Sequence, residues 1–309
     1  MPSLVSFLLV AVIPMFIGIF YSFTDWNGMN NQINFVGFQN YIKILTNDPG
    51  FINAFVFTLK YAVVEVILVN VCALALALFI TSKYTPFSGF FKGAFFLPNL
   101  IGGILLGFIW QFIFTKGFSS IAATFNLPFF DKWLSTTQTG FLGLIIVSSW
   151  QSIGYMMLIY IAGLTSISEE VLEAASIDGA VGFKKLKYIT LPLLMPTVTV
   201  GLFMNIAGAF KVFDQNLSLT SGGPYNSTQM ISLNIYNTAY TYNDLGAAQA
   251  KAIIFLIVVG CIAFIELYNE QKNCKKNNSR FNSFYISNYI FISVLCIGHQ
   301  LIQNPKGYL

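Results

Sequence analysis

The stretch that decides the fold is Thr58–Ile80, which reads TLKYAVVEVILVNVCALALALFI and has only two charged side chains, Lys60 and Glu65. An α-helix of about 20 residues crosses the roughly 30 Å hydrocarbon core of a bilayer. Because lipid offers no hydrogen-bond partners to the backbone, an apolar run of this length must fold as a helix. The stretch therefore predicts a transmembrane helix.

Five further apolar runs of similar length accompany it, and the alternating pattern of a membrane β-barrel is absent. The first of them lacks the basic segment of a signal peptide and is too long for one, so we count it as a span. The sequence predicts an all-α integral membrane protein, with six transmembrane helices in one domain of residues 1–280. The five runs are Leu4–Phe23, Ala94–Phe114, Phe141–Leu164, Leu193–Phe213 and Ala247–Tyr268.

The composition agrees with a membrane location. Of the 309 residues, 56% are hydrophobic and only 9% are charged, whereas soluble domains carry roughly 25% charged residues. A soluble enzyme and a disordered tail are excluded on this ground, and a basic nucleic-acid-binding protein is disfavoured. The sequence has one His and no Cys/His cluster, so we expect no metal, no cofactor and no catalytic residue.

Lysine and arginine are enriched in cytoplasmic loops and so indicate orientation. Lys60, Lys211 and Lys251 lie at helix edges, where we expect the long side chains to reach the interface. With the N-terminus inside, nine basic residues fall on the cytoplasmic side and three on the other. We therefore expect the N-terminus and the tail after the sixth span to be cytoplasmic. The nine are Lys83, Lys92, Lys184, Lys185, Lys187, Lys272, Lys275, Lys276 and Arg280, and the three are Lys43, Lys116 and Lys132.

The C-terminal extension of residues 281–309 is atypical. Its apolar stretch Phe281–Ile302 contains Asn282, Asn288, His299 and Gln300 and is a weak candidate for a seventh span, so both possibilities stay open. We hypothesise that Phe281–Leu309 is a fusion or frameshift remnant. The first span begins almost at Met1 with no charge ahead of it, and the start is a candidate for truncation.

The longest predicted cytoplasmic loop, Thr165–Pro192, reads TSISEEVLEAASIDGAVGFKKLKYITLP. Ser166 with Glu169 three residues later predicts a capping box at the start of a helix. Asp178-Gly179 predicts its end, because Gly accepts the left-handed conformation that closes helices. A second short helix is expected from Val181 to Thr190.

Two interpretations of this loop are possible from its chemistry. An amphipathic connector could rest on lipid headgroups, which the basic cluster Lys184–Lys187 would suit. The acidic side chains of the first helix suit anionic headgroups poorly. An acidic helix with a face of small Ala side chains is better explained by insertion into a protein cleft, and we favour that interpretation.

Three blocks of the loop resemble the EAA loop of permeases of binding-protein-dependent ABC importers. Other segments are similar to the sugar-importing, maltose-permease-like branch of these permeases, and the resemblance extends from Ile13 to Tyr268. The three blocks are Glu173–Ala175, Asp178–Ala180 and Ile189–Pro192; the other segments are Ser22–Trp26, Phe35–Tyr41, Phe210–Asp214 and Gly222–Pro224.

The resemblance implies that residues 165–192 dock into a groove of a separate cytoplasmic ATPase subunit. Glu173 would be the polar contact, Ala174 and Ala175 the close-packing surface, and Gly179 the corner. The chain has no GxxxxGK[ST] phosphate loop, so ATP hydrolysis is expected on that partner. The other residues implied in coupling are Glu169, Glu170, Asp178, Ala180 and Pro192.

The resemblance also implies the rest of the assembly and its mechanism. A second permease subunit, two ATP-binding cassette subunits and an extracytoplasmic solute-binding protein would be partners, within membrane lipid. The outer loops Thr24–Gly50 and Asp214–Leu245 would meet the binding protein. A sugar or related solute would then be imported by alternating access.

Polar side chains within two spans are candidates for the solute pathway. Their uncharged amide and hydroxyl groups beside aromatic rings suit a neutral polyhydroxylated solute. Hydrogen bonding between helices is the alternative; it is equally supported for Gln151 and Asn205 and favoured for Ser148 and Ser152. The candidates are Ser148, Gln151, Ser152 and Tyr155, which share one helical face, together with Asn205 and the small Gly208 on the next span.

Two other functions compete with an importer subunit. An ion-coupled carrier of a small polar solute would want a carboxylate near the membrane midplane, and Glu65 is the candidate. A non-transporting membrane scaffold would tolerate loss of Gln151. An intramembrane enzyme is disfavoured, because no Ser/His, Asp/Asp or metal constellation occurs in the spans.

Overall fold

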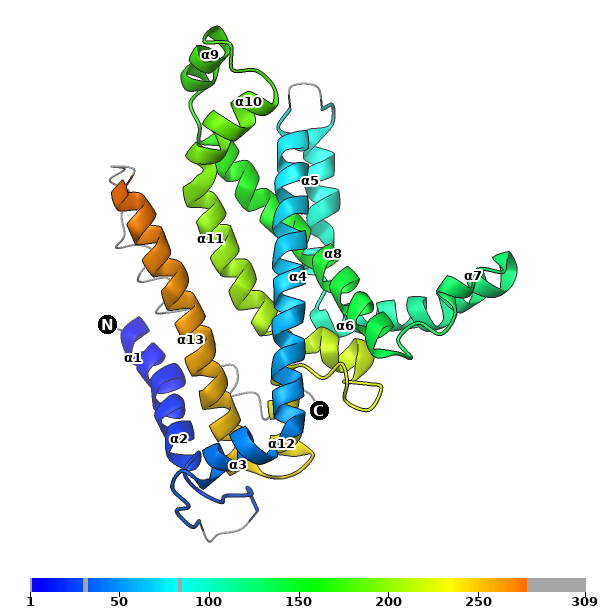
Figure 1. The fold of residues 1–309 in the computed structure, drawn as a ribbon, viewed down its shortest axis with the longest axis vertical. Coiled ribbons are helices and arrows are strands. Elements are labelled where there is room, and N and C mark those ends of the chain that lie inside the picture. Colours follow the sequence, from blue (N-terminus) through cyan, green and yellow to red (C-terminus); the bar gives the residue numbers. More distant parts are fainter. Residues whose placement is uncertain (1, 30–32, 83–84, 277–309) are drawn as a thin grey trace. The chain divides into compact units, whose positions relative to one another are not determined.

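The computed structural model describes residues 2–29, 33–82 and 85–276 (Figure 1). Within these ranges the chain is helical, apart from loops and one isolated antiparallel bridge between Thr24 and Phe35. The C-terminal extension, with its candidate span Phe281–Ile302, lies outside the described residues. The chain divides into two compact units, which are described separately below.

The first unit comprises the described residues up to Leu59, Phe210–Phe213 and those from Tyr225 onward. Within it, α13 packs against α2, α3 and α12. The helices are α1 (Pro2–Phe7), the π-helix η1 (Leu8–Val12), α2 (Ile13–Tyr21), α3 (Gln39–Asn47), the first part of α4 (Pro49–Ile80), α12 (Ile231–Tyr240) and α13 (Leu245–Lys276).

The second unit comprises Lys60–Ala209 and Asp214–Pro224. Besides the remainder of α4 and a loop described with the functional site, it contains two long helices, α8 (Thr137–Thr165) and α11 (Leu191–Phe210). Its shorter elements are α5 (Ser88–Phe96), the 3₁₀ helices η2 (Leu97–Leu100) and η4 (Pro128–Phe130), α6 (Gly103–Phe112), the π-helices η3 (Ile113–Gly117) and η6 (Asn216–Thr220), and α7 (Phe118–Phe125).

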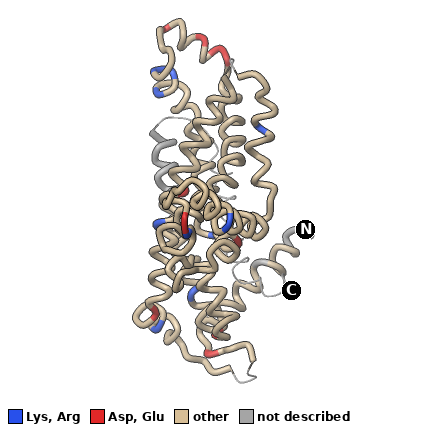
Figure 2. The backbone as a smooth tube through the Cα atoms, turned by 90° about the vertical axis from the view of Figure 1, so that its right-hand side faces the viewer, with Lys and Arg blue, Asp and Glu red and all other residues tan. Residues whose placement is uncertain are grey.

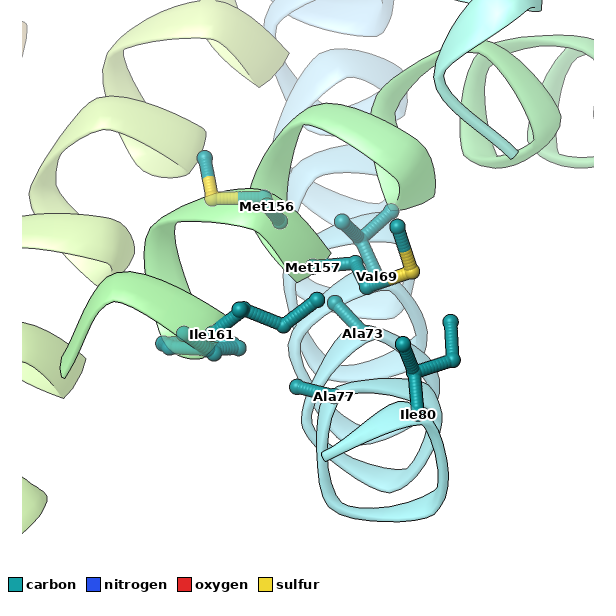
Figure 3. Close-up of a cluster of buried hydrophobic side chains, with 8 residues drawn as sticks. Val69, Ala73, Ala77, Ile80, Met156, Met157 and Ile161 are labelled. Carbon is teal, nitrogen blue, oxygen red and sulfur yellow. The ribbon is translucent and has the colours of Figure 1, made fainter. Parts of the chain in front are cut away.

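The core of the second unit lies between α4 and α8 (Figure 3). On α4, Ala73 and Ala77 are one turn apart and present little side chain, so α8 can approach closely. The larger side chains of α8 fill the space against them. The eight buried members of this cluster are Val69, Ala73, Ala77, Ile80, Met156, Met157, Tyr160 and Ile161.

The prediction of membrane-spanning helices is confirmed by length and composition. Among the described residues, five helices are long and apolar enough to cross a membrane, and a shorter apolar helix, Val5–Tyr21, corresponds to the first predicted run. The five are Pro49–Ile80, Gly103–Phe125, Thr137–Thr165, Phe183–Phe210 and Leu245–Ile265.

The prediction of one continuous helix over Ala94–Phe114 is wrong. The α-helix ends at Phe96, a 3₁₀ turn containing Pro98 follows, and Ile101 is extended before α6 begins at Gly103. Proline and glycine together explain the break, since Pro lacks the N–H that would continue the helix and Gly weakens it. The membrane-length helix begins after the break and runs to Phe125.

Lys251, one of the lysines placed at helix edges by the sequence, is turned into the protein. Lys251 is 5% exposed, and its Nζ lies 2.7 Å from Asp48 Oδ2. The same nitrogen donates hydrogen bonds to Asn234 Oδ1 at 3.0 Å and Thr238 Oγ1 at 2.8 Å. The cation therefore joins α12, α13 and the start of α4 within the first unit.

Asp48 occupies the N-terminal end of α4 and accepts a hydrogen bond from the backbone N–H of Phe51 at 2.9 Å. Burial alone would raise the pKa of Asp48, but the hydrogen bond and charge of Lys251 and the backbone N–H groups lower it below its ordinary value of 3.8. A carboxyl with a lowered pKa stabilises the fold above its unfolded pKa. That stabilisation is lost only as the pH falls through the lowered value.

We predict that Lys251→Met lowers the free energy of unfolding by roughly 2 kcal/mol, because it leaves the half-buried Asp48 beside α12 and α13 without its cation. The unfolding temperature of the purified assembled transporter in detergent measures this. The loss should be the same between about pH 6 and pH 8, since Asp48 stays ionised there. Adding Asp48→Asn should restore part of the loss, and Lys60→Met, at an exposed position, should have little effect. An equal loss in Lys60→Met would contradict the prediction.

Candidate functional site

The loop between the two long helices of the second unit folds into two short helices. They are α9 (Glu169–Ile177) and α10 (Phe183–Lys185), which continues through the π-helix η5 (Leu186–Thr190) into α11. The predicted capping box is not formed. The helix begins after Ser168, and the Ser166 hydroxyl instead donates to the Gly163 carbonyl at 2.7 Å, at the end of α8. Because the Ser166 hydroxyl is engaged with the Gly163 carbonyl, it does not cap α9, which begins at Glu169.

The corner of the loop forms where it was predicted. Gly179 has φ +80°, in the left-handed region, and the N–H of Ala180 bonds to the Ala175 carbonyl at 2.9 Å. This arrangement closes α9 in the manner expected of a C-terminal Gly. An added Cβ at Gly179 would meet nothing within 4 Å, so the backbone conformation alone favours Gly here.

The predicted second helix, Val181–Thr190, is correct in place but is not separate from the next span. The helix runs without interruption from Phe183 to Phe210. Pro192 lies just after the π-turn of η5. Since proline cannot donate a backbone hydrogen bond to the preceding turn, a π-bulge there accommodates it. The loop is thus rigidly continuous with α11.

The residues predicted to couple this loop to an ATPase lie mostly on its surface. Glu169, Glu170, Glu173, Ala174, Asp178, Gly179 and Pro192 are exposed, Ala180 is half-buried and Ala175 is buried. Figure 2 shows charged residues gathered at this loop, whereas the long helices that carry it are mostly uncharged. Lys185 Nζ donates to the Ser176 hydroxyl at 3.0 Å and ties the two short helices together.

The tip of the loop also exposes large apolar side chains, which the sequence analysis did not single out. Ile177 is 86% exposed and Phe183 is 75% exposed. They lie on either side of the Gly179 corner, at the end of the second unit that α9 and α10 form (Figure 1). Apolar side chains so exposed beside acidic ones are typical of a protein-binding surface.

The predicted polar face of α8 is split between the interior and the surface. Ser148 is 3% exposed, and its hydroxyl makes no hydrogen bond. Ser152 is half-buried. Tyr155 is 39% exposed, and its hydroxyl points to Met204 Sδ on α11 at 3.7 Å. Trp150, beside this face, is 43% exposed.

Gln151 on α8 hydrogen-bonds to two non-helical segments, one between η2 and α6 and the other just before η6. Its Nε2 donates to the Ile101 carbonyl at 2.7 Å, in the extended residue after η2. Its Oε1 accepts from Nε2 of Gln215 at 2.5 Å, just before η6. Gln215 was not found by sequence analysis, because it lies outside the predicted spans and 64 positions from Gln151.

Asn205 on α11 is 4% exposed and bonds only within the protein. Its Oδ1 accepts from Asn70 Nδ2 at 3.1 Å, and its Nδ2 lies 3.5 Å from Glu65 Oε1 on α4. The Tyr160 hydroxyl on α8 donates to Asn70 Oδ1. Gly208, one turn further along α11, is exposed, with open space around it. Sequence analysis considered Glu65 only for ion coupling and missed Asn70 and Tyr160.

The position of the α8 face depends on Gly154. An added Cβ there would lie 1.8 Å from the carbonyl oxygen of Phe95 and 2.5 Å from its carbonyl carbon. The end of α5 therefore lies directly on the α8 backbone between Gln151 and Tyr155. Only Gly permits such a close approach.

Long apolar helices and a projecting two-helix loop characterise the described residues as an α-helical integral membrane protein. The family described as "Binding-protein-dependent transport system inner membrane component" matches residues 70–272. The chain belongs to this family and is an integral protein of the inner membrane, a transport component rather than an enzyme.

Curated relatives extend the comparison over most of the chain. The chain is 47% identical over 271 residues to the "Probable starch degradation products transport system permease protein AmyD" of Thermoanaerobacterium thermosulfurigenes, covering 88% of this chain and 92% of that protein. It is 34% identical over 264 residues to the "Multiple sugar-binding transport system permease protein MsmF" of Streptococcus mutans, covering 84% and 89%.

A solved structure has the same fold. The chain matches a bacterial ABC transporter involved in the import of the acidic polysaccharide alginate with a TM-score of 0.77 and 22% identity, covering 88% of this chain and 93% of that chain. The all-α permease fold predicted from the sequence is confirmed.

We predict that Gly154→Ala reduces the amount of assembled transporter by more than half, because the added methyl group must push α5 away from α8. Gly260→Ala on α13 is the matched control, since an added Cβ there meets nothing within 4 Å. Helix propensity alone would favour alanine at both positions. Quantitative purification from membranes measures the effect. Equal yields of the two variants would contradict the prediction.

Proposed function

We propose that this chain is one of two permease subunits through which an ATP-driven importer takes up a sugar. Two ATP-binding cassette subunits would supply the energy, and an extracytoplasmic binding protein would deliver the solute. The relatives named for starch degradation products and for multiple sugars support a sugar substrate. The 47% identical relative favours an oligosaccharide from starch.

The observation that carries the proposal is the projecting loop of residues 165–192. The loop presents a compact surface that would fit a protein groove, made of exposed Glu173, Ala174, Ile177 and Phe183 around the left-handed corner at Gly179. Because the helix from Phe183 to Phe210 is continuous, a force on α10 is transmitted directly to α11. We infer that the ATPase subunit moves α11 in this way during alternating access.

The solute pathway follows from the same helices. We propose that Ser148, Gln151, Ser152, Tyr155, Asn205 and Gly208 border it, with Tyr155 and the open space at Gly208 nearest the solute. These groups are uncharged. A sugar offers hydroxyl groups for amides and apolar ring faces for an aromatic side chain, and both kinds of partner occur here.

The orientation follows from the docking of the loop. We infer that residues 165–192 lie in the cytoplasm, which also places the N-terminus and the tail after α13 there. The Lys and Arg distribution in the loops supports this. The outer loops 24–50 and 214–245 would then face the binding protein.

We predict that Glu173→Lys combined with Gly179→Trp abolishes co-purification of the ATPase subunit with the tagged chain in mild detergent. The charge reversal removes the polar contact, and a Trp at φ +80° strains the corner. Asp131→Lys, an exposed charge reversal outside the loop, is the control and should retain the ATPase. Retention by the double variant, or no ATPase with the wild type, would contradict the proposed coupling and orientation.

We predict that Tyr155→Ala raises the KM for ATP-driven uptake of radiolabelled maltotriose about tenfold, since a ring packed on a sugar contributes about 1–1.5 kcal/mol. Tyr155→Phe keeps the ring and should remain within about twofold of wild type. Uptake into proteoliposomes that contain the complete transporter measures both. An unchanged KM in Tyr155→Ala would remove Tyr155 from the pathway.

A further inference from the structure

We propose that a chain of hydrogen bonds from Tyr160 through Asn70 and Asn205 to Glu65 positions the amide of Asn205 for the solute, so that Glu65 is a positioning residue for uptake. The inference rests on the proposed function, because it assigns a role to a side chain bordering the pathway. All four residues belong to the second unit, on α4, α8 and α11.

The orientation of the Asn70 amide is fixed by the backbone. Its Nδ2 donates to the Val66 carbonyl at 2.7 Å, one turn earlier on α4. A carbonyl can only accept, so the nitrogen must face Val66 and the Asn70 oxygen must face the other way. That oxygen accepts from the hydroxyl of Tyr160.

The orientation of the Asn205 amide follows from that of Asn70. The second N–H of Asn70 Nδ2 points to Asn205 Oδ1 at 3.1 Å. The nitrogen of Asn205 is thereby turned toward Glu65 Oε1, 3.5 Å away. Glu65 completes the chain as the acceptor, and every donor in the chain points in the same direction, from α8 through α4 and α11.

The end of the chain retains unused hydrogen-bonding capacity. Glu65 is 2% exposed, and its Oε2 is buried without a partner. Nδ2 of Asn205 carries two hydrogens, and only the contact with Glu65 engages it. The second N–H of Asn205 is therefore available to a hydroxyl group of the solute, and Glu65 holds the amide in the direction that presents it.

Because the Asn205 amide is buried, its orientation depends on which partners are within reach. Polar groups within a membrane bundle take up whatever partner is nearest, because an unsatisfied one is costly in hydrocarbon. Without the acceptor at position 65, the Asn205 amide would turn to another partner. The solute would then meet a differently directed side chain, although the helices stay packed through the α4–α8 core.

The test uses the complete transporter in proteoliposomes and measures KM for radiolabelled maltotriose together with the amount of assembled complex. Glu65→Leu removes the acceptor at similar volume, whereas Glu65→Gln keeps an acceptor oxygen. Tyr160→Phe removes only the hydroxyl that holds Asn70. Ser149→Ala is the control, because Ser149 is equally buried at 4% and its hydroxyl makes no hydrogen bond.

We expect Glu65→Leu to raise KM at least fivefold with an unchanged amount of complex, and Glu65→Gln and Ser149→Ala to stay within twofold of wild type. Tyr160→Phe should raise KM two- to threefold.

A Glu65→Leu variant that loses complex but keeps the wild-type KM would make Glu65 a packing residue and overturn the proposal. If Glu65→Leu does not assemble, an unchanged KM in Tyr160→Phe overturns it. A wild-type transporter that takes up no maltotriose would instead overturn the proposed substrate, and this inference with it.

Discussion

The close packing of α4 on α8 is the contact on which the rest of the second unit depends. Ala73 and Ala77 leave room for Met156 and Met157, so the two helices approach within side-chain contact over several turns (Figure 3). Tyr160 belongs to this apolar cluster through its ring, yet its hydroxyl reaches Asn70 on α4. The apolar packing thereby sets the separation at which the polar chain can form. In lipid, where apolar burial between helices gives little net gain, such packing and hydrogen bonding supply the specificity.

The projecting loop shows how a membrane helix can be linked rigidly to a surface outside the membrane. A Pro at position 192 would ordinarily kink or end the helix that continues into α11. The π-turn of Leu186–Thr190 absorbs the missing hydrogen bond instead. The turn between α9 and α10 is made at Gly179 and Gly182, which both have positive φ, a conformation that glycine adopts without strain.

The membrane-spanning helices were predictable from hydropathy, whereas the permease fold was predictable from the resemblance carried by the loop of residues 165–192. Apolar runs such as Thr58–Ile80 have no alternative to a helix in lipid. The errors arose where local signals compete. Ser166 satisfied the pattern of a capping box, but the Gly163 carbonyl at the end of α8 was nearer. Pro98 and Gly102 interrupted a run whose mean composition was that of a span. Hydropathy averages over a window and cannot register one missing N–H.

The candidate site was predictable only in part, for a different physical reason. The corner at Gly179 is local, so the turn chemistry of Asp178-Gly179 revealed it. The partners of buried polar groups are not local. Asn205 lies 140 positions from Glu65 and 135 from Asn70, and Lys251 lies 203 positions from Asp48. Spacing along one helix gives a face, but it does not give the helix that this face meets.

Glu65 on α4 and Lys251 on α13 show that the role of a charged residue depends on the neighbouring helix it meets. From the sequence, Glu65 suggested ion coupling and Lys251 suggested an interfacial side chain. Each is instead buried against amide and hydroxyl groups of neighbouring helices. A charged or acidic group inside a membrane protein is retained only where partners compensate its desolvation. Lys251 has an aspartate and two further acceptors, so its charge and its three N–H donors are all paired. Its role is to hold the first unit together. Glu65 has one hydrogen bond and one carboxyl oxygen without a hydrogen-bond partner, so its desolvation is compensated only in part, which is in keeping with the proposed positioning role and not with a role in packing alone.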